Sequence, residues 1–242
     1  DAGLHLTLTS EWKDYRWHPL AGAKVVKGLI DTEGAMHRNV KEVIAHASPD
    51  EVFQEIKAQL DRSLAMGWAP THFDSHMGTL MADPAFLQKY VQLGIEAKIP
   101  IMLPVGHNTM VKISENISAS QQQILEAIGK HLWTNGLPVI DDLHNLSYSW
   151  KIPAGMTSPK KLRKYKSQLY IDSFKKLQPG ITFVITHCTA MSDIFPHISD
   201  SGWLRLSDLE AMKDPALKKY LQHEGIIFTT WKELIERRKK VN

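Results

Sequence analysis

Short apolar and β-branched runs alternate with longer amphipathic stretches along the whole chain. Apolar runs of about four to eight residues bounded by turn-forming residues are typical of β-strands, whereas apolar positions three and four residues apart are typical of helices. Strands that alternate with helices indicate βαβ units and a parallel sheet. The expected strands are Gly3–Thr9, Thr71–His76, Ile101–Pro104, Pro138–Asp141, Ile181–His187 and Ile226–Thr230.

The helical stretches carry capping signals at their ends. A polar residue followed by proline marks a helix start, because the side chain caps the first turn and proline needs no amide partner there. Such pairs occur at Ser48-Pro49, Asp83-Pro84 and Ser158-Pro159. Glycine just after a helical pattern marks an end. The expected helices cover residues 48–67, 83–98, 118–133, 158–179, 207–225 with a break at Pro215, and 231 onward.

This alternation predicts an α/β fold, which we interpret as an irregular β/α barrel of parallel strands, similar to a TIM barrel. A chain of 242 residues can bury one large core, so we expect one domain over residues 1–242. Six strands are fewer than the usual eight, and this count alone also allows an open sheet. The chain opens at Asp1 directly into a strand, so we expect the barrel to lack its first strand here, with a βα unit of about 30 or more residues upstream.

Composition narrows the class of protein. Lysine and arginine total 29 against 26 acidic residues, and the basic clusters at residues 160–164 and 237–240 lie on predicted helices without interleaved aromatic residues. A solvated helix face explains them, so we expect no nucleic-acid partner. No apolar run is long enough to span a membrane, and we expect no membrane partner. Cys188 is the only cysteine, which excludes an internal disulfide and fits the cytoplasm, although the compartment stays open.

Histidine recurs at or near the ends of three predicted strands. His5 lies in the first strand and His187 ends the fifth. In the second, His72, Asp74 and His76 share one face, because side chains alternate along a strand. Imidazole and carboxylate groups from separate strand ends can converge on one divalent cation and leave a position open for water. A cation bound there lowers the pKa of water and polarises a carbonyl oxygen, as amide hydrolysis requires.

Each of these histidines also has an ordinary explanation. A lone strand histidine is more often a satisfied core or surface residue than a ligand. Three polar groups on one face of an apolar strand are costly to bury without a partner, and either a metal or a hydrogen-bonded network would serve. Asp141, Asp142 and His144 form a weaker cluster, which is either substrate-binding or only a loop.

Two long loops, residues 10–35 and 106–116, follow the carboxyl ends of predicted strands. Binding sites of α/β folds lie at these ends. Aromatic rings in such a loop suit stacking on sugars, yet they would equally pack the loop against the barrel. The first loop carries Trp12, Tyr15, Arg16, Trp17 and His18.

Three motifs in order point to a known family. They are Gly-Leu-His-Leu-Thr-Leu-Thr at residues 3–9, Pro-Thr-His-Phe-Asp-Ser-His at residues 70–76, and a strand that ends in His187. Together they resemble the YdjC/ChbG family of carbohydrate deacetylases. The resemblance spans nearly the whole chain and includes Leu-Ile-Asp-Thr-Glu-Gly at residues 29–34 and Gly-Ile-Ile-Phe-Thr-Thr at residues 225–230.

The resemblance implies an irregular β/α barrel with one divalent cation, held by one aspartate and two histidines. Matched motif by motif, the histidine ligands are His5 and His76, and Asp74 orients a ligand or the substrate. His187 matches a histidine expected to act as the general acid on the leaving amine. The further residues expected to bind substrate or support the ligands are His72, Arg16 and Trp17.

The chain departs from the family pattern in three places. The family opens with an Ala-Asp-Asp-Phe-Gly-like strand that supplies a metal ligand and a general base, and nothing here matches it. Met77-Gly78-Thr79 replaces further histidines, which puts the usual chitooligosaccharide specificity in doubt. Cys188 replaces the proline that follows His187 in the family.

We therefore expect a hydrolase that removes N-acetyl groups from amino sugars or short N-acetylated oligosaccharides through metal-activated water. The cofactor is one divalent ion, Mg²⁺ or Zn²⁺. The partner is a small carbohydrate, and the sequence leaves a homodimer open. The alternatives are a metal-dependent sugar isomerase or aldolase on a similar barrel, and a catalytically inactive carbohydrate-binding homologue.

Overall fold

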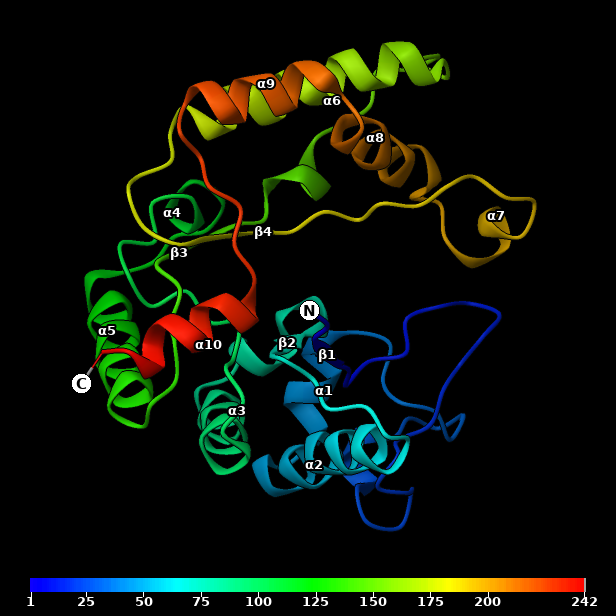
Figure 1. The fold of residues 1–242 in the computed structure, drawn as a ribbon. Helices are drawn as coiled ribbons and strands as arrows, with labels where there is room; N and C mark the ends of the chain where they lie inside the picture. The colour runs from blue at the N-terminus through cyan, green and yellow to red at the C-terminus, as the bar shows by residue number, and fades with distance from the viewer. Residues whose placement is uncertain (242) are drawn as a thin grey trace. The chain divides into compact units, whose positions relative to one another are not determined.

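The computed structural model describes residues 1–241, which divide into two compact units. Among the described residues, the first unit comprises residues 1–103, 130–139 and 230–241, and the second comprises residues 104–129 and 140–229. Each unit contains short parallel strands and helices, so the predicted α/β class is confirmed (Figure 1). The single domain stays a prediction.

The strands of the first unit are β1 (Leu4–Leu6) and β2 (Phe73–Ser75). They pair in parallel, and their register sets His5 opposite Asp74. Ile101 continues this sheet through a single parallel bridge to Phe73. Because parallel strands end at the same edge, the segments after Leu6 and Ser75 leave the sheet on the same side.

Helices cover the sheet of the first unit. α2 contacts β1 and packs on α3, and the buried Tyr90 of α3 donates its hydroxyl hydrogen to the carbonyl oxygen of Phe73 at 2.8 Å. This bond ties the helix to the strand that precedes His76. The helical elements are η1 (Lys27–Leu29), α1 (Val40–His46), α2 (Pro49–Ala65), η2 (His76–Met81), α3 (Pro84–Ala97) and α10 (Trp231–Lys239).

The second unit has a two-stranded parallel sheet of β3 (Asp142–His144) and β4 (Thr182–Val184). α6 packs on α8 and α9 around a core that includes Tyr170 and Phe174 (Figure 1). The helical elements are α4 (Val111–Ser114), η3 (Leu146–Ser149), α6 (Pro159–Phe174), α7 (Phe195–Ile198), α8 (Gly202–Met212) and α9 (Pro215–His223). α5 (Ala119–Thr134) contributes residues to both units.

Two of the three predicted capping residues cap their helices, whereas Ser158 precedes α6 without a side-chain cap hydrogen bond. Ser48 caps α2 in a capping box with Glu51, with Pro49 in the first turn. Asp83 accepts hydrogen bonds from two amides at the start of α3. The break predicted at Pro215 separates α8 from α9. Local polar chemistry determines these boundaries, because the first-turn amides need an acceptor from outside the helix.

Several predicted boundaries are wrong. The segment Ile226–Thr230 is not a strand: no described strand pairs with it, and Phe228 is 78% exposed. A strand requires a neighbouring backbone, and an apolar run alone does not supply one. The α6 helix ends at Phe174, well before Pro179, and α8 already begins at Gly202.

The remaining strands are shorter than predicted, because pairing is confined to short segments. Residues 101–104 and 138–141 take part only through single parallel bridges, Phe73 with Ile101 and Pro104 with Ile140. Within residues 1–241 the named strands form two separate two-stranded sheets, and no closed barrel is formed among them.

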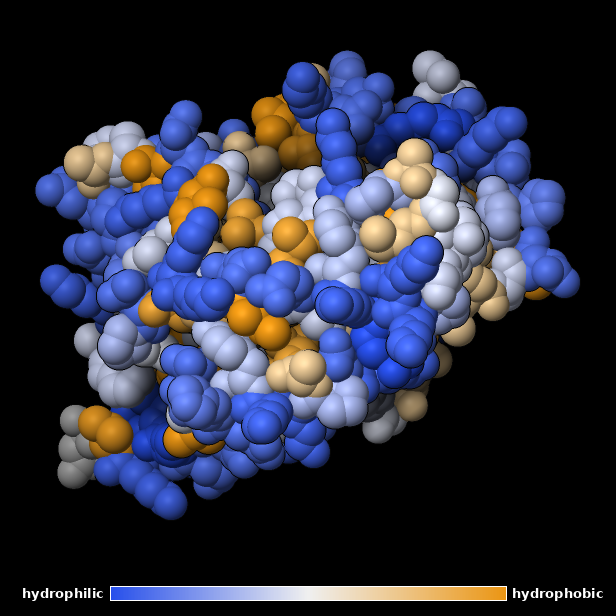
Figure 2. Space-filling model, turned by 90° about the horizontal axis from the view of Figure 1, so that it is seen from above, coloured by the Kyte–Doolittle hydropathy of each residue, from blue (hydrophilic) through white to orange (hydrophobic). Residues whose placement is uncertain are grey.

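The surface of the protein is mainly hydrophilic on the face shown in Figure 2. Apolar side chains occur on this face in small groups. Isolated exposed apolar residues are ordinary on protein surfaces. Among the described residues, every helix is too short or too polar to cross a bilayer.

Candidate functional site

Two imidazoles meet where β1 and β2 end. His5 Nδ1 lies 2.9 Å from Asp74 Oδ1 across the strand pair, as the register requires. His5 Nε2 lies 3.1 Å from Nδ1 of His76, the residue that directly follows β2. The rings meet edge to face, with centroids 5.1 Å apart. The strand pairing therefore brings together both predicted histidine ligands and Asp74.

Glu11 completes this row of polar groups. Its Oε1 lies 3.0 Å from His76 Nε2, and its Oε2 lies 3.4 Å from the Thr9 hydroxyl, which can donate to it. Burial is the largest influence on the pKa of Glu11 and raises it, but the hydrogen bonds with His76, Thr9 and a backbone amide and the charge of His76 together hold the pKa below its usual value. The sequence analysis missed Glu11. The available signal was a carboxylate shortly after the end of the first predicted strand.

A sharp turn after β2 directs His76. Met77 and Gly78 both have left-handed backbone angles, with φ of 53° and 66°. A left-handed methionine is disfavoured, because its Cβ crowds the backbone. The Thr79 hydroxyl donates to the His76 carbonyl at 2.9 Å, and Ser75 Oγ accepts from the Leu80 amide at 3.0 Å. These bonds hold the turn, so His76 leaves the strand in a defined direction.

The imidazole pair fits a divalent cation. Two imidazole nitrogens bound to one tetrahedral cation at about 2.0–2.1 Å stand about 3.3 Å apart, close to the observed 3.1 Å. The His5 side chain is 55% exposed, so an ion can reach the pair from solvent. Across residues 1–241, no three histidine, cysteine or acidic side chains are grouped to hold a metal ion. His5 and His76 would therefore need further ligands to complete the coordination of a cation.

His72 lies apart from the imidazole pair. It is buried, and its ring stacks on Trp231 of α10 with centroids 4.9 Å apart. Its Nδ1 lies 3.1 Å from the hydroxyl of Thr71, and burial lowers the pKa of His72. His72 is on the same strand side as Asp74 but two residues earlier, where it packs a helix against the sheet.

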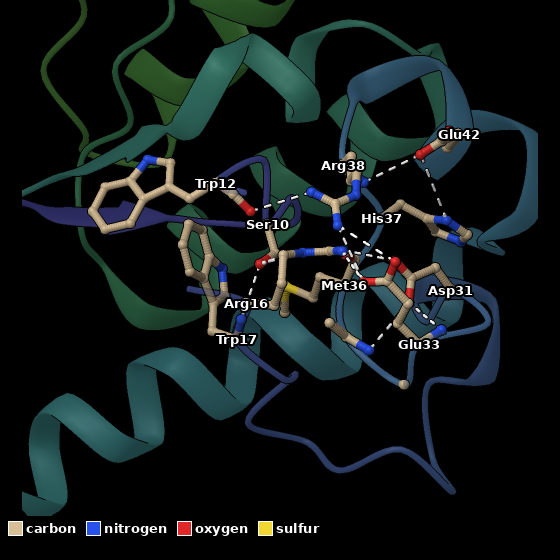
Figure 3. A network of polar contacts seen from close by, with 12 residues as sticks. Ser10, Trp12, Arg16, Trp17, Asp31, Glu33, Met36, His37, Arg38 and Glu42 are labelled. Carbon is tan, nitrogen blue, oxygen red and sulfur yellow. Dashed lines mark hydrogen bonds and ion pairs between the residues drawn. The ribbon is translucent and has the colours of Figure 1, made fainter. Parts of the chain in front are cut away.

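Arg16 holds the first loop together (Figure 3). Its guanidinium donates to Asp31 Oδ2 at 2.6 Å, to Glu33 Oε2 at 2.7 Å and to the carbonyl oxygen of Met36 at 2.6 Å. Burial would raise the pKa of Asp31, but Arg16 and nearby amides hold it below its usual value. The Arg16 side chain is only 12% exposed, so its observed contacts are structural.

Three aromatic rings cluster in the same loop. Trp12 and Trp17 meet edge to face with centroids 5.3 Å apart, and Tyr15 lies 6.2 Å from each of them. The Trp17 amide donates to Ser10 Oγ at 2.9 Å (Figure 3). Tyr15 is 66% exposed, so the cluster both packs within the loop and presents a ring to solvent.

His187 belongs to the second unit and follows β4. Its amide donates to Asp208 Oδ2 at 3.0 Å, and its ring lies 4.9 Å from that of Tyr148. Asp208 is fully buried, with Lys166 Nζ and the Tyr170 hydroxyl 3.2 Å and 2.8 Å from its Oδ1. Burial lowers the pKa of Lys166, against the opposing effect of Asp208. A buried ion pair thus holds the backbone of His187.

The weaker predicted cluster has structural contacts. Asp142 is buried and accepts from the amide of Met110 at 2.8 Å, and Asp141 accepts from the amide of Ile181 at 2.8 Å. His144 is buried with its Nε2 2.8 Å from Ser173 Oγ, and burial lowers its pKa to about 4. These groups join strands and loops of the second unit.

Several proteins of similar sequence are described as carbohydrate deacetylases, in agreement with the family that the motifs resemble. A carbohydrate deacetylase of Thermus thermophilus is 31% identical over 104 residues, which is 43% of this chain and 38% of the relative. One of Brevibacillus brevis is 35% identical over 113 residues, 46% of this chain and 40% of the relative. These two matches therefore span less than half of the length of either relative. A carbohydrate deacetylase of Thermoanaerobacter pseudethanolicus is 18% identical and covers 95% of this chain and 76% of its own length.

A solved structure shares the fold. The chain superposes on a cellobiose-phosphate cleavage protein of Enterococcus faecalis with a TM-score of 0.69 and 19% identity, covering 96% of this chain and 77% of that one. At this identity the likeness concerns the fold alone. The model of the YdjC-like protein family matches residues 1–223. The chain therefore belongs to the YdjC-like family.

Proposed function

We propose that this protein is a metal-dependent carbohydrate deacetylase, which hydrolyses the N-acetyl group of an amino sugar or a short N-acetylated oligosaccharide. The observation that carries the proposal is the imidazole pair, whose facing nitrogens are 3.1 Å apart and whose other nitrogens each meet a carboxylate. The descriptions of the relatives support the same activity. We further propose that the α/β fold of the protein is an irregular β/α barrel.

The reaction adds water across the amide. A bond forms between the water oxygen and the carbonyl carbon, the carbon–nitrogen bond breaks, and one water proton goes to the departing amine. Acetic acid, which ionises at neutral pH, and the free amino sugar are the products. We assign His5 and His76 as ligands of one Mg²⁺ or Zn²⁺ ion. When bound, such an ion polarises the amide carbonyl and lowers the pKa of water.

The other residues position groups or move protons. Asp74 accepts from His5 Nδ1 and thereby fixes the orientation of that ring. We assign His187 as the general acid that protonates the amine nitrogen, on the strength of the motif that it ends. The exposed Tyr15 ring beside Trp12 and Trp17 suits stacking against the apolar face of a sugar.

The test is acetate release by the full-length protein from a panel of N-acetylated mono- and oligosaccharides, with and without a chelator. We expect release that the chelator abolishes and that added Mg²⁺ or Zn²⁺ restores. Release that survives complete metal removal would contradict the metal assignment. Sugar binding without release would identify an inactive binding protein, and isomerisation without acetate would identify the isomerase class.

A further inference from the structure

Each imidazole of the pair is held by its own carboxylate. His5 Nδ1 lies 2.9 Å from Asp74 Oδ1, and His76 Nε2 lies 3.0 Å from Glu11 Oε1. Asp74 was expected in a supporting role from the sequence, whereas nothing in the motifs assigns a role to Glu11. The two carboxylates come from different segments, β2 and the first loop, and they meet the rings at chemically different nitrogens.

The carboxylates determine where the ring protons lie. An ionised carboxylate only accepts hydrogen bonds, so the nitrogen that faces it must carry the hydrogen. His5 is therefore protonated on Nδ1 and His76 on Nε2. In the neutral rings, the remaining nitrogens, His5 Nε2 and His76 Nδ1, then carry lone pairs. These two atoms face each other at 3.1 Å.

Two facing lone pairs repel unless a positive charge lies near both. Without Glu11, the pair has a simple alternative: His76 moves its hydrogen to Nδ1 and donates it to His5 Nε2 as an ordinary hydrogen bond. That arrangement removes one of the two lone pairs that a cation needs. Glu11 opposes it, because its Oε1 engages Nε2 of His76.

We propose that Glu11 is a positioning residue, which locks His76 in the Nε2-protonated form and aims its Nδ1 lone pair, with that of His5, at one divalent cation. The inference rests on the proposed metal site. Thr9 supports the geometry, because its hydroxyl lies within hydrogen-bonding reach of the second oxygen of Glu11. Carboxylates that hold ligating imidazoles in this way typically change metal affinity about 10–100-fold when they are removed.

The test measures imidazole tautomers and metal affinity in the full-length protein. Two-bond ¹H–¹⁵N NMR of the metal-free protein at about pH 8.5, where ordinary imidazoles are neutral, reports which nitrogen carries hydrogen. We expect Nε2–H on His76 and Nδ1–H on His5 in the wild type. In Glu11→Ala, we expect His76 to shift toward Nδ1–H and the calorimetric affinity for Zn²⁺ to fall about 10–100-fold.

Two further variants control this result. Glu11→Gln keeps an oxygen that can accept from Nε2–H, so it should retain the tautomer and lose less affinity than Glu11→Ala. Glu96→Ala removes an exposed glutamate of α3 whose side chain accepts a hydrogen bond from Gln92, away from the imidazole pair, and it should change neither quantity. Circular dichroism confirms that each variant is folded.

The outcomes separate this inference from the deacetylase proposal. An unchanged His76 tautomer and unchanged Zn²⁺ affinity in Glu11→Ala would overturn the role of Glu11. Equal affinity losses in Glu11→Gln and Glu11→Ala, with the tautomer retained in both, would make Glu11 a direct ligand instead. Both measurements use no sugar, so normal tautomers and Zn²⁺ binding without acetate release would contradict only the proposed reaction.

Discussion

The two units use carboxylates in opposite ways. In the first, Asp74 and Glu11 each hold one nitrogen of a partly exposed imidazole and leave the other nitrogen directed at its neighbour. In the second, Asp208 is fully buried, and its two oxygens engage Lys166 and the amide of His187 among other donors. The first arrangement leaves one nitrogen of each imidazole without a carboxylate partner, as the proposed metal site requires, whereas the second arrangement fixes the backbone of His187.

The largest effect should come from the general acid proposed in the second unit. We expect His187→Ala to lower turnover about 10²–10⁴-fold, because the leaving amine then lacks its proton donor. Metal content should stay at the wild-type level, as measured by atomic emission. His223→Ala, at an exposed histidine of α9, is the control. Loss of metal together with activity would make His187 a ligand, and full activity would make it structural.

The buried pair of the second unit should dominate stability. Lys166→Met removes the cation beside Asp208 and leaves a buried carboxylate without its charge partner, so we expect the free energy of unfolding to fall by about 3–5 kcal/mol. Urea denaturation measures it. Lys175→Met breaks an exposed pair with Asp172 and should leave stability unchanged. Similar stabilities for the two variants would show that Asp208 is held by its neutral partners alone.

His144 should make the stability of the second unit depend on pH. Its pKa is about 4 in the folded protein, whereas an ordinary histidine has a pKa of about 6.5, so the unfolded state binds more protons between these values. Stability is therefore full above about pH 6.5 and is lost as pH falls to about 4, by up to about 3 kcal/mol. Replacement by glutamine should flatten this part of the curve in urea titrations at several pH values. A His144→Gln curve with the same slope would assign the dependence to other groups.

The smallest effect on stability should come from the imidazole pair. The His5 side chain is 55% exposed, so we expect His5→Ala to change the free energy of unfolding by at most about 0.5 kcal/mol. The same variant should abolish Zn²⁺ binding in calorimetry. A large destabilisation with intact Zn²⁺ binding would show that His5 is a structural residue and not a metal ligand.

The sequence pattern predicted those parts of the fold that depend on residues close together in the chain. The caps at Ser48 and Asp83 could be predicted from the sequence, because the first-turn amides of a helix need a nearby hydrogen-bond acceptor. The parallel pairing of the first two strands sets His5 opposite Asp74, a contact that the motifs did not specify. The prediction of a strand at residues 226–230 was wrong, because an apolar pattern does not indicate whether a neighbouring strand is present.

The sequence predicted a supporting role for Asp74 but did not predict the contact between Glu11 and His76. Glu11 reaches His76 only through the path of the first loop, which the Arg16 contacts help to hold (Figure 3). His72 has the same strand alternation as Asp74 but stacks on Trp231, a residue far away in the sequence. The alternation of side chains along a strand predicts which face a residue lies on, but it does not predict which distant residue packs against that face.

The most direct test of the account is a crystal structure of the full-length protein grown with Zn²⁺, with data collected at the zinc absorption edge. We predict one anomalous peak about 2.0–2.1 Å from both His5 Nε2 and His76 Nδ1, with Glu11 and Asp74 on the opposite nitrogens. A zinc ion bound elsewhere, with the two imidazoles hydrogen-bonded to each other, would contradict it.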